Sequence, residues 1–384
     1  MTRPLTASST RLRVLCAPNA FRGTLSAAAA ARALAAGVRD AGGEPVTVPM
    51  ADGGDGTLSL LVRGVSGAHL QRHPVSGPLG GRAIASLGWL DEETAVVELA
   101  GVAGLRRLAS PRPLDATSRG VGEMLARAID GGARRVVVGL GGSASTDGGA
   151  GLLTALGARL LDRRGQPLRG GGGALTGLDR VDLSELHPRI GRLRLEAAVD
   201  VLSPLLGPAG AARVFAPQKG ASPEQVVQLE DGLARLVSVM ERDGGIPARL
   251  SAAPGTGAAG GCGWGLAVLG ADLVPGAALV ADALGLDAAL DGCDLVITGE
   301  GRLDTQTAAG KAPAEVARRA ALHGVPCIAV AGSVLALPPG FTSAVSLGEV
   351  ADSGEDPLLL ASRLLRRAAA ILTRAASVAP HGGN

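Results

Sequence analysis

Residues 12–50, LRVLCAPNAFRGTLSAAAAARALAAGVRDAGGEPVTVPM, contain the local patterns that decide the fold class. LRVLCA (12–17) is a short apolar run, which is typical of a buried strand. An alanine-rich helix is predicted next, with Thr24 or Ser26 as its N-cap and a glycine pair at its end. EPVTVPM (44–50) predicts a second strand. A strand, a helix and a strand in this order predict an α/β fold with a parallel sheet.

The C-terminal part of the chain repeats this pattern. CDLVIT (293–298) and VPCIAVAG (325–332) are predicted strands with a helix between them, and a final amphipathic helix is predicted near 357–376. A chain of 384 residues also exceeds what one core usually serves. We therefore expect one discontinuous domain, residues 1–74 and 276–384, with a second α/β domain, residues 75–275, inserted into it.

Composition excludes several classes of function. The formal net charge is only +2, aromatic residues make up 1% and tyrosine is absent, so neither a nucleic-acid groove nor a base-stacking surface is expected. The N-terminus lacks the apolar segment of a signal peptide, and no apolar window is long enough to span a membrane. Four cysteines without a CxxC pair argue against zinc. We expect a soluble cytoplasmic protein.

Glycine loops with polar residues dominate the candidate sites. GLGGSASTDGGAGLLTALG (139–157) follows the predicted strand RRVVVGL and precedes an apolar run. A strand, a glycine turn and a helix point backbone N–H groups at an anion. The same pattern fits a structural turn equally well, and Asp147 could hold a metal ion or cap the helix. MADGGDGT (50–57) offers Asp52 and Asp55 as oxygen ligands for Mg²⁺ beside phosphates, with a helix-capping turn as the alternative.

Two further loops contain the chain's only lysines, Lys219 and Lys311, against 35 arginines. TGEGRLDTQTAAGKAP (298–313) follows a predicted strand, where α/β folds place ligands, but it fails the P-loop pattern because Ala312 follows the lysine. Asp200 begins the second loop, which ends in APQKG. Another loop, PGTGAAGGCGW (254–264), suits close helix packing at least as well as ligand contact. Glycine loops, acidic residues and two lysines together favour phosphoryl transfer to a small polar molecule.

Six motifs, taken in order, resemble those of the bacterial glycerate kinases of the GarK/GlxK type (glycerate kinase type 1 family), from about residue 14 to 335. They are APNAFRGTLSA, MADGGDGTL, GLGGSASTDGGAGLLTALG, DVLSPLLGPAGAARVFAPQKGA, PGTGAAGGCGWGL and DLVITGEGRLDTQTAAGKAP. The resemblance implies transfer of the γ-phosphate of ATP to D-glycerate with Mg²⁺, giving 2-phosphoglycerate or, alternatively, 3-phosphoglycerate. It also implies a Rossmann- or flavodoxin-like domain built from both chain ends, with an α/β domain inserted between them.

The resemblance also suggests a role for individual residues. The expected catalytic residues are Asp200, Asp304 and Lys311, and the substrate-binding residues are Arg22, Glu300 and Arg302. ATP phosphates are expected at Gly141, Gly142, Ser143, Lys219 and Gly310, and the metal at Asp52, Asp55 and Asp147. The family's first loop usually reads APDSFKGSLSA, so Asn19 here replaces a carboxylate. That loss is the support for a second hypothesis, a non-catalytic sugar-acid or nucleotide sensor. A homodimer is the candidate assembly.

Overall fold

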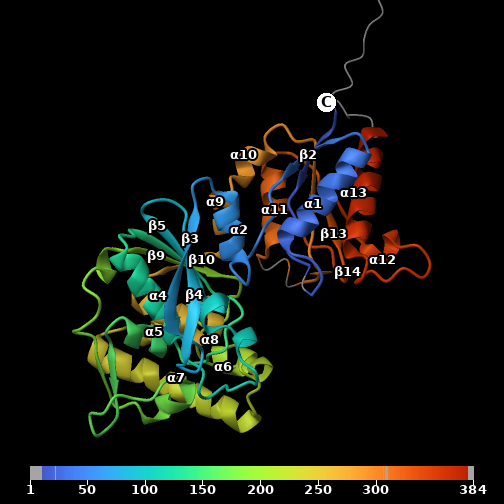
Figure 1. Ribbon diagram of the computed structural model, residues 1–384. Helices are drawn as coiled ribbons and strands as arrows, with labels where there is room; N and C mark the ends of the chain where they lie inside the picture. Colours follow the sequence, from blue (N-terminus) through green and yellow to red (C-terminus); the bar gives the residue numbers. More distant parts are fainter. Residues whose placement is uncertain (1–10, 22, 306, 308–309, 379–384) are drawn as a thin grey trace, which may run out of the picture. The chain divides into compact units, whose positions relative to one another are not determined.

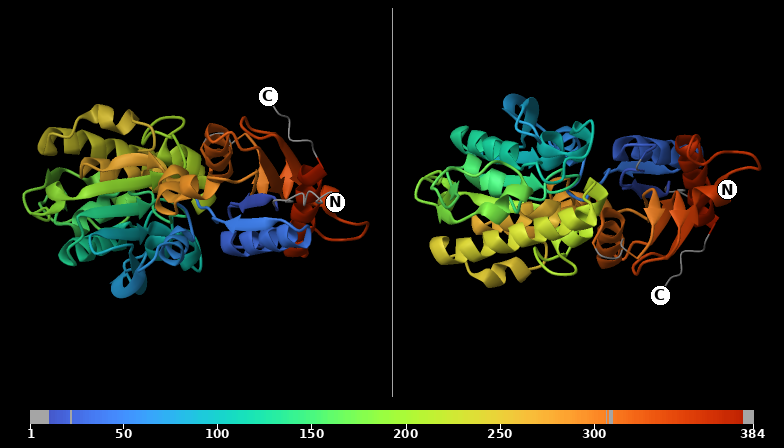
Figure 2. Two further views of the ribbon diagram at one scale, coloured as in Figure 1. Left: turned by 90° about the horizontal axis from the view of Figure 1, so that it is seen from above. Right: turned by 90° about the horizontal axis from the view of Figure 1, so that it is seen from below.

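The computed structural model describes residues 11–21, 23–305, 307 and 310–378, which fold into two compact units (Figure 1). The first unit combines Met1–Ala51 with Ala281–Asn384, and the second is Asp52–Val280. In the first unit α1 (Ala27–Asp40) packs beside α13 (Ala361–Val378), so elements from the two ends of the sequence lie side by side (Figures 1 and 2).

The sheet of the first unit is parallel throughout, with the strand order β15-β13-β11-β1-β2. With the strands numbered along the chain, this is the flavodoxin-like order 2-1-3-4-5. The order in which strands are added to the sheet reverses between the first strand, β1, and the third, β11, and this place is the topological switch point. The remaining elements of this unit are β1 (Arg13–Cys16), β2 (Glu44–Thr47), α10 (Leu286–Leu290), β11 (Leu295–Thr298), β12 (Arg302–Leu303), α11 (Ala312–Leu322), β13 (Cys327–Ala331), β14 (Ser333–Val334), β15 (Ser343–Ser346) and α12 (Leu347–Val350).

The central strands of this sheet have apolar side chains that are buried on both of its faces. Val14 and Cys16 on β1, with Leu295 and Ile297 on β11, belong to the core that α1 and α13 share. Leu15 is equally buried but points to the opposite face, since successive side chains of a strand alternate. Helix α11 packs on β11 and β13. Near-continuous apolar strands are what a parallel sheet covered on both faces requires.

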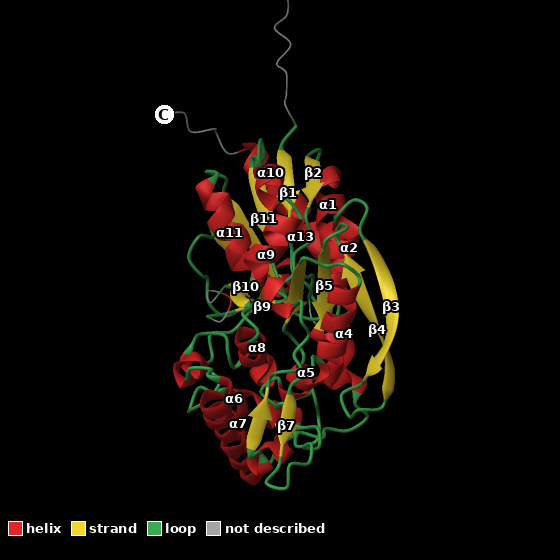
Figure 3. Ribbon diagram, turned by 90° about the vertical axis from the view of Figure 1, so that its left-hand side faces the viewer, coloured by secondary structure: helices red, strands yellow, loops and turns green. Residues whose placement is uncertain are grey.

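The second unit has a six-stranded mixed sheet in the order β10-β9-β6-β5-β4-β3. Strands β10, β9, β6 and β5 run parallel, whereas β3 and β4 form an antiparallel hairpin at one edge (Figure 3). The elements are α2 (Thr57–Gly64), β3 (His69–Ser76), β4 (Arg82–Trp89), β5 (Thr94–Glu98), α3 (Leu99–Ala103), α4 (Arg119–Asp130), β6 (Arg135–Gly139), α5 (Ala150–Ala155), β7 (Arg159–Leu161), β8 (Arg180–Asp182), β9 (Arg194–Val199), α6 (Ala211–Phe215), α7 (Pro223–Gly244), α8 (Ala258–Val268) and β10 (Asp272–Pro275). Helix α9 (Gly276–Ala283) begins in this unit and ends in the first one.

The boundaries between the units differ from the predicted ones. The sequence pattern predicts that residues 52–74 belong to the terminal domain, but they lie in the second unit. The physical reason is local: α2 packs on β4 and β5, its N-terminal N–H groups are held by Glu98, and β3 pairs with β4 along its whole length. The predicted insertion therefore begins too late, and residues 276–280 also belong to the second unit.

The glycine-rich segment 163–175 is closely packed at its C-terminal end. Gly171 and Gly172 are buried, and a 3-10 helix starts at Gly172. A Cβ atom at Gly172 would overlap the carbonyl oxygen of Thr146. The glycines thus allow close packing and do not loosen the chain.

Among the described residues, no helix is both long and apolar enough to cross a bilayer.

Candidate active site

Two glycine loops of the second unit pack backbone against backbone beyond the carboxyl ends of its parallel strands. A Cβ atom at Gly53 would lie 2.9 Å from the Cβ of Ala198 on β9. One at Gly139, the last residue of β6, would lie 2.6 Å from the carbonyl oxygen of Gly53, and one at Gly141 would lie 2.5 Å from the Cα of Gly54. Only residues without a side chain allow these loops to touch. The MADGGDGT and GLGGSASTDGG motifs therefore form one structure.

The beginning of the second of these loops presents backbone donors. The N–H groups of Gly141, Gly142 and Ser143 donate no hydrogen bond within the part of the chain that the structure describes. Gly142 is exposed and has a φ of 65°. Successive N–H groups around a left-handed residue form a concave site that suits an anion. This geometry supports the predicted phosphate contact for Gly141 and Gly142 through their backbones.

Ser143 and Lys219 face each other inside the protein. The Lys219 ammonium donates hydrogen bonds to Ser143 Oγ at 2.7 Å and to the Ser145 carbonyl oxygen at 2.6 Å. Lys219 is only 4% exposed, and burial lowers the pKa of its side chain to about 8, against smaller opposing effects of Cys262 and Asp147. These contacts stabilise the loop from within. The direct phosphate contact predicted for the side chains of Ser143 and Lys219 therefore lacks support, and we assign both a positioning role.

Asp147 is completely buried and is surrounded by donors. Its Oδ2 accepts hydrogen bonds from Ser118 N at 2.8 Å, Ser118 Oγ at 2.9 Å, Thr117 Oγ1 at 3.3 Å and Gly151 N at 3.3 Å, and its Oδ1 accepts one from Gly149 N at 3.2 Å. Burial raises the pKa of this carboxyl, opposed by these hydrogen bonds. A carboxylate saturated by protein donors has no open face for a metal ion. The predicted metal role gives way to a structural one: Asp147 ties the loop to the start of α4.

Asp52 and Asp55, the other predicted metal ligands, lie in the first glycine loop. Asp52 is buried, and its Oδ1 accepts a hydrogen bond from Gly54 N at 3.3 Å, which forms a local turn; the helix that follows is capped by Glu98 and not by Asp52. The Asp55 carboxylate, about half exposed, forms an ion pair with Arg106 at 2.9 Å. No group of three or more potential metal-ligating side chains occurs among the described residues. The loop offers carboxylate oxygens singly and is not a preformed metal cage.

Asp200 follows the last residue of β9, so it lies at the carboxyl end of a central strand of the second sheet. It is half-buried. This is the position at which α/β sheets place ligand-binding residues. The structure thus places Asp200 on the same edge as Gly139 and the two glycine loops, because β6 and β9 are parallel neighbours.

The first unit supplies a separate set of predicted residues, at the topological switch point between β1 and β11. β1 and β11 are adjacent, and the loops after them touch: Asn19 N donates a hydrogen bond to the Gly299 carbonyl oxygen at 2.8 Å. Thr298 Oγ1 donates to the carbonyl oxygen of Ala17 at 2.7 Å. Asn19, which replaces the family's aspartate, is buried and its own Oδ1 accepts from Ala20 N at 2.7 Å. Its amide therefore orders the loop.

The loop after β11 brings Glu300, Arg302 and Asp304 together. Thr307 Oγ1 donates to Glu300 Oε1 at 2.7 Å, and Asp304 N donates to Thr307 Oγ1 at 3.2 Å. Arg302 pairs with Asp304 at 3.1 Å, with the arginine side chain 65% exposed and the aspartate 18%. Glu300 is buried. Arg302 is consequently available to an incoming anion, whereas Asp304 is partly neutralised.

Gly310 and Lys311 complete the set in the first unit. Gly310 has a φ of 106°, which favours glycine, and Lys311 occupies the N-cap position of α11. A cation here and the N-terminus of α11 both favour an approaching anion. The predicted substrate residue Arg22 lies outside the described residues.

Some residues that shape the site were not predicted. Glu98 caps α2 through Gly56 N at 2.7 Å, and Ser118 links Asp147 to α5 by accepting from Leu152 N at 3.0 Å. The PGTGAAGGCGW loop packs against another loop, which is the packing alternative given for it above. Gly148 N donates a hydrogen bond to the Gly260 carbonyl oxygen at 3.0 Å, so this loop supports the glycine loop that follows β6.

The second unit has backbone N–H groups available at Gly141 and Gly142, and the flavodoxin-like unit has a loop with charged side chains after β11. These features define a two-unit α/β protein suited to binding small anions. Comparison with known proteins gives the family. A model of the glycerate kinase family matches residues 14–377. The glycerate kinase of Bacillus subtilis (strain 168) is 42% identical over 329 residues, covering 84% of this chain and 85% of that protein.

Two further relatives agree. The glycerate 2-kinase of Escherichia coli (strain K12) is 41% identical over 330 residues, covering 84% of this chain and 86% of the relative. The crystal structure of a putative glycerate kinase 2 from Salmonella typhimurium LT2 superposes with a TM-score of 0.82 at 38% identity, covering 95% of this chain and 98% of that one. The chain therefore belongs to the glycerate kinase family, as its six motifs predicted, and is a kinase.

Proposed function

We propose that this protein transfers the γ-phosphate of ATP to D-glycerate, giving 2-phosphoglycerate and ADP with the help of Mg²⁺. The observation that carries the proposal is the 41% identity, over 84% of this chain, to a protein named glycerate 2-kinase. Phosphoryl transfer of this kind depends on positioning and charge neutralisation more than on covalent chemistry, and the glycine loops and cationic side chains described above suit that demand.

The proposed base is a carboxylate that orients the attacking hydroxyl and accepts its proton. Asp200 and Asp304 are the candidates. Asp304 already forms an ion pair with Arg302. Asp200 follows β9 on the sheet edge where the two glycine loops lie, so we take it as the first candidate and Asp304 as the second.

Substrate recognition is proposed to use the remaining charged groups. The exposed guanidinium of Arg302 suits the glycerate carboxylate, because arginine binds carboxylates through paired donors. Glu300 supports the same loop through Thr307 and suits a hydroxyl of the substrate. Lys311, with Gly310 before it, is proposed to meet a phosphate as a point charge. Backbone donors of Gly141 and Gly142 are proposed to hold the phosphate that is transferred.

Magnesium fits the residues present under one condition. Mg²⁺ is commonly bound by one or two carboxylates together with substrate phosphates and waters. Asp52 and Asp55 can supply such carboxylates, although Asp55 must first exchange its partner Arg106, whose side chain is 84% exposed. When bound with the nucleotide, the ion neutralises charge on the phosphates. The chain's own part is to present Asp52 on a loop fixed by the Gly53 and Gly141 contacts.

One experiment tests the proposal and both alternatives. Purified protein is incubated with D-glycerate and Mg-ATP, and the products are examined by ³¹P NMR. We expect 2-phosphoglycerate and ADP. A 3-phosphoglycerate signal would make the protein a 3-kinase, whereas no glycerate-dependent ADP release would refute catalysis and favour the sensor hypothesis that Asn19 raised.

A further inference from the structure

The second unit contains a cavity of about 980 Å³ that none of the predicted site residues lines. Its walls are the turn 79–80 after β3, residues 112–119 in the connection after β5, residues 150–154 in α5 after β6, and the segment 157–175. The first three come from the carboxyl-end side of the sheet, where ligands of α/β proteins bind. The volume is near the upper end for small-molecule sites.

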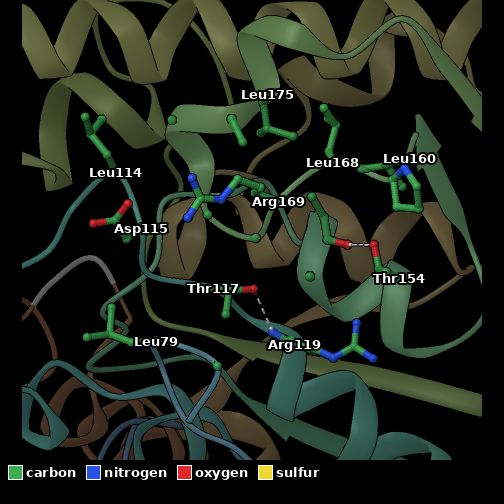
Figure 4. Close-up of a pocket in the computed structure, with 18 of the residues that line it drawn as sticks. Leu79, Leu114, Asp115, Thr117, Arg119, Thr154, Leu160, Leu168, Arg169 and Leu175 are labelled. Carbon is green, nitrogen blue, oxygen red and sulfur yellow. Dashed lines mark hydrogen bonds between the residues drawn. The ribbon is translucent and has the colours of Figure 1, made fainter. Parts of the chain in front are cut away.

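The cavity has an apolar wall. Figure 4 shows Arg169 extending across the centre of the view, with leucine side chains on several sides of it. The leucines that line the cavity are Leu79, Leu114, Leu160, Leu168 and Leu175. Such a wall suits a ligand with a flat, weakly polar body, because burying apolar surface is favourable.

Positive charge is in excess around the same cavity. The lining includes one acidic side chain, Asp115, and four arginines, Arg112, Arg119, Arg159 and Arg169. Arg112 is paired with Asp115 at 2.6 Å, and Arg119 contacts Glu123 at 3.1 Å. Arg169 makes no hydrogen bond or ion pair within the described ranges. Its guanidinium is therefore available to an anionic group.

The cavity wall is fixed to the glycine loop that begins at Gly141. Asp147 of that loop accepts hydrogen bonds from Thr117 Oγ1 and Gly151 N, both at 3.3 Å, and Thr117 and Gly151 line the cavity. On the other wall, Gly172 lies between the lining residues Gly171 and Gly173 and packs against the carbonyl oxygen of Thr146, so no side chain fits between them. One buried aspartate and one glycine contact thus make the cavity and the loop a single structure.

We infer that this cavity binds the adenine nucleotide, with the base against the leucines and a phosphate at Arg169. The inference rests on the proposed function, which supplies two substrates to choose between. Glycerate has three carbons, a carboxylate and two hydroxyls, so it has no use for an apolar wall and would leave most of the volume unfilled. A nucleotide combines a flat base with phosphates, and arginine is the side chain best suited to hold phosphate through paired donors.

The test measures binding of Mg-ADP to the full chain by isothermal titration calorimetry. Arg169→Ala is the informative variant, since an exposed side chain without a protein partner can be removed without disturbing the fold. Arg164→Ala is the matched control, because Arg164 is exposed in the same connection and does not line the cavity. We expect Arg169→Ala to weaken Mg-ADP about tenfold or more, and Arg164→Ala to bind as the wild type does. The KM for ATP should rise while that for D-glycerate stays unchanged.

Hydrogen–deuterium exchange locates the ligand independently of any variant. Mg-ADP should slow exchange in residues 112–119 and 168–175, and D-glycerate alone should not. If the wild type makes phosphoglycerate but Arg169→Ala binds Mg-ADP normally and neither segment is protected, the inference is overturned and the proposed function stands. If the wild type neither binds Mg-ADP nor phosphorylates D-glycerate, both fall together.

Discussion

Removal of the Asp147 carboxylate is the sharpest test of how the glycine loop is built. Asp147→Ala deletes the acceptor of five hydrogen bonds, three of them from the backbone N–H groups of Ser118, Gly149 and Gly151. Asp147→Asn keeps the shape and one acceptor oxygen, but it removes the charge and turns an NH₂ group toward one of these donors. We therefore expect the order of stability wild type, then Asn, then Ala.

The magnitude follows from the buried donors that each change leaves unsatisfied. One buried donor without a partner costs about 1–3 kcal/mol, so three backbone donors would cost several times this. Relief of the buried charge offsets part of the loss, because burial already raises the pKa of Asp147. We expect a net loss of about 3–5 kcal/mol in the free energy of unfolding for Asp147→Ala and about 1–3 kcal/mol for Asp147→Asn.

Tryptophan fluorescence during urea unfolding gives a specific readout of this change. The chain has two tryptophans, Trp89 and Trp264, and both are buried in the second unit's core, so their signal reports that unit. Asp162→Ala is the matched control, since Asp162 accepts from Arg164 N at 2.8 Å in an exposed turn. It should cost no more than about 1 kcal/mol. An Asp147→Ala protein as stable as this control, with a raised requirement for Mg²⁺, would refute the structural role and restore the metal role.

Three further outcomes are expected. The folded-state pKa of Lys219, about 8, lies below its ordinary 10.5, so the unfolded chain binds more protons between these values and the stability contribution of Lys219 rises with pH there. The wild type should gain up to about 3 kcal/mol over Lys219→Met between pH 8 and 10.5 in equilibrium unfolding, and a constant difference would contradict this. Gly260→Ala should lose about 2–5 kcal/mol by thermal or urea unfolding, because φ is 69° and a Cβ would overlap the Ser145 carbonyl oxygen, whereas Gly191→Ala, with open space around it, should change stability by no more than about 0.5 kcal/mol. Asp200→Asn should lower kcat about a hundredfold with the circular dichroism spectrum unchanged, and a wild-type kcat would remove Asp200 from the mechanism.

Much of the candidate site could be predicted because its loops follow strands directly. A glycine loop after an apolar strand must lie at the strand's carboxyl end, and the structure places the loops after β6, β9 and β11 there. The role proposed for the backbones of Gly141 and Gly142 could be inferred from the sequence for this reason. The roles of Ser143 and Asp147 were not, since a sequence does not say whether a polar side chain points outward or into the core.

The sequence by itself determined the fold class and the family. Periodicity and strand length depend on local preferences and on burial of an apolar face, and six motifs in a fixed order leave little room for another family. Tertiary structure decided where the two units divide, which aspartate is buried, and that the 157–175 segment forms a wall of a cavity containing Arg169. These properties depend on contacts between residues far apart in the chain, such as Asp147 with Ser118 and Gly172 with Thr146, and no local pattern encodes them.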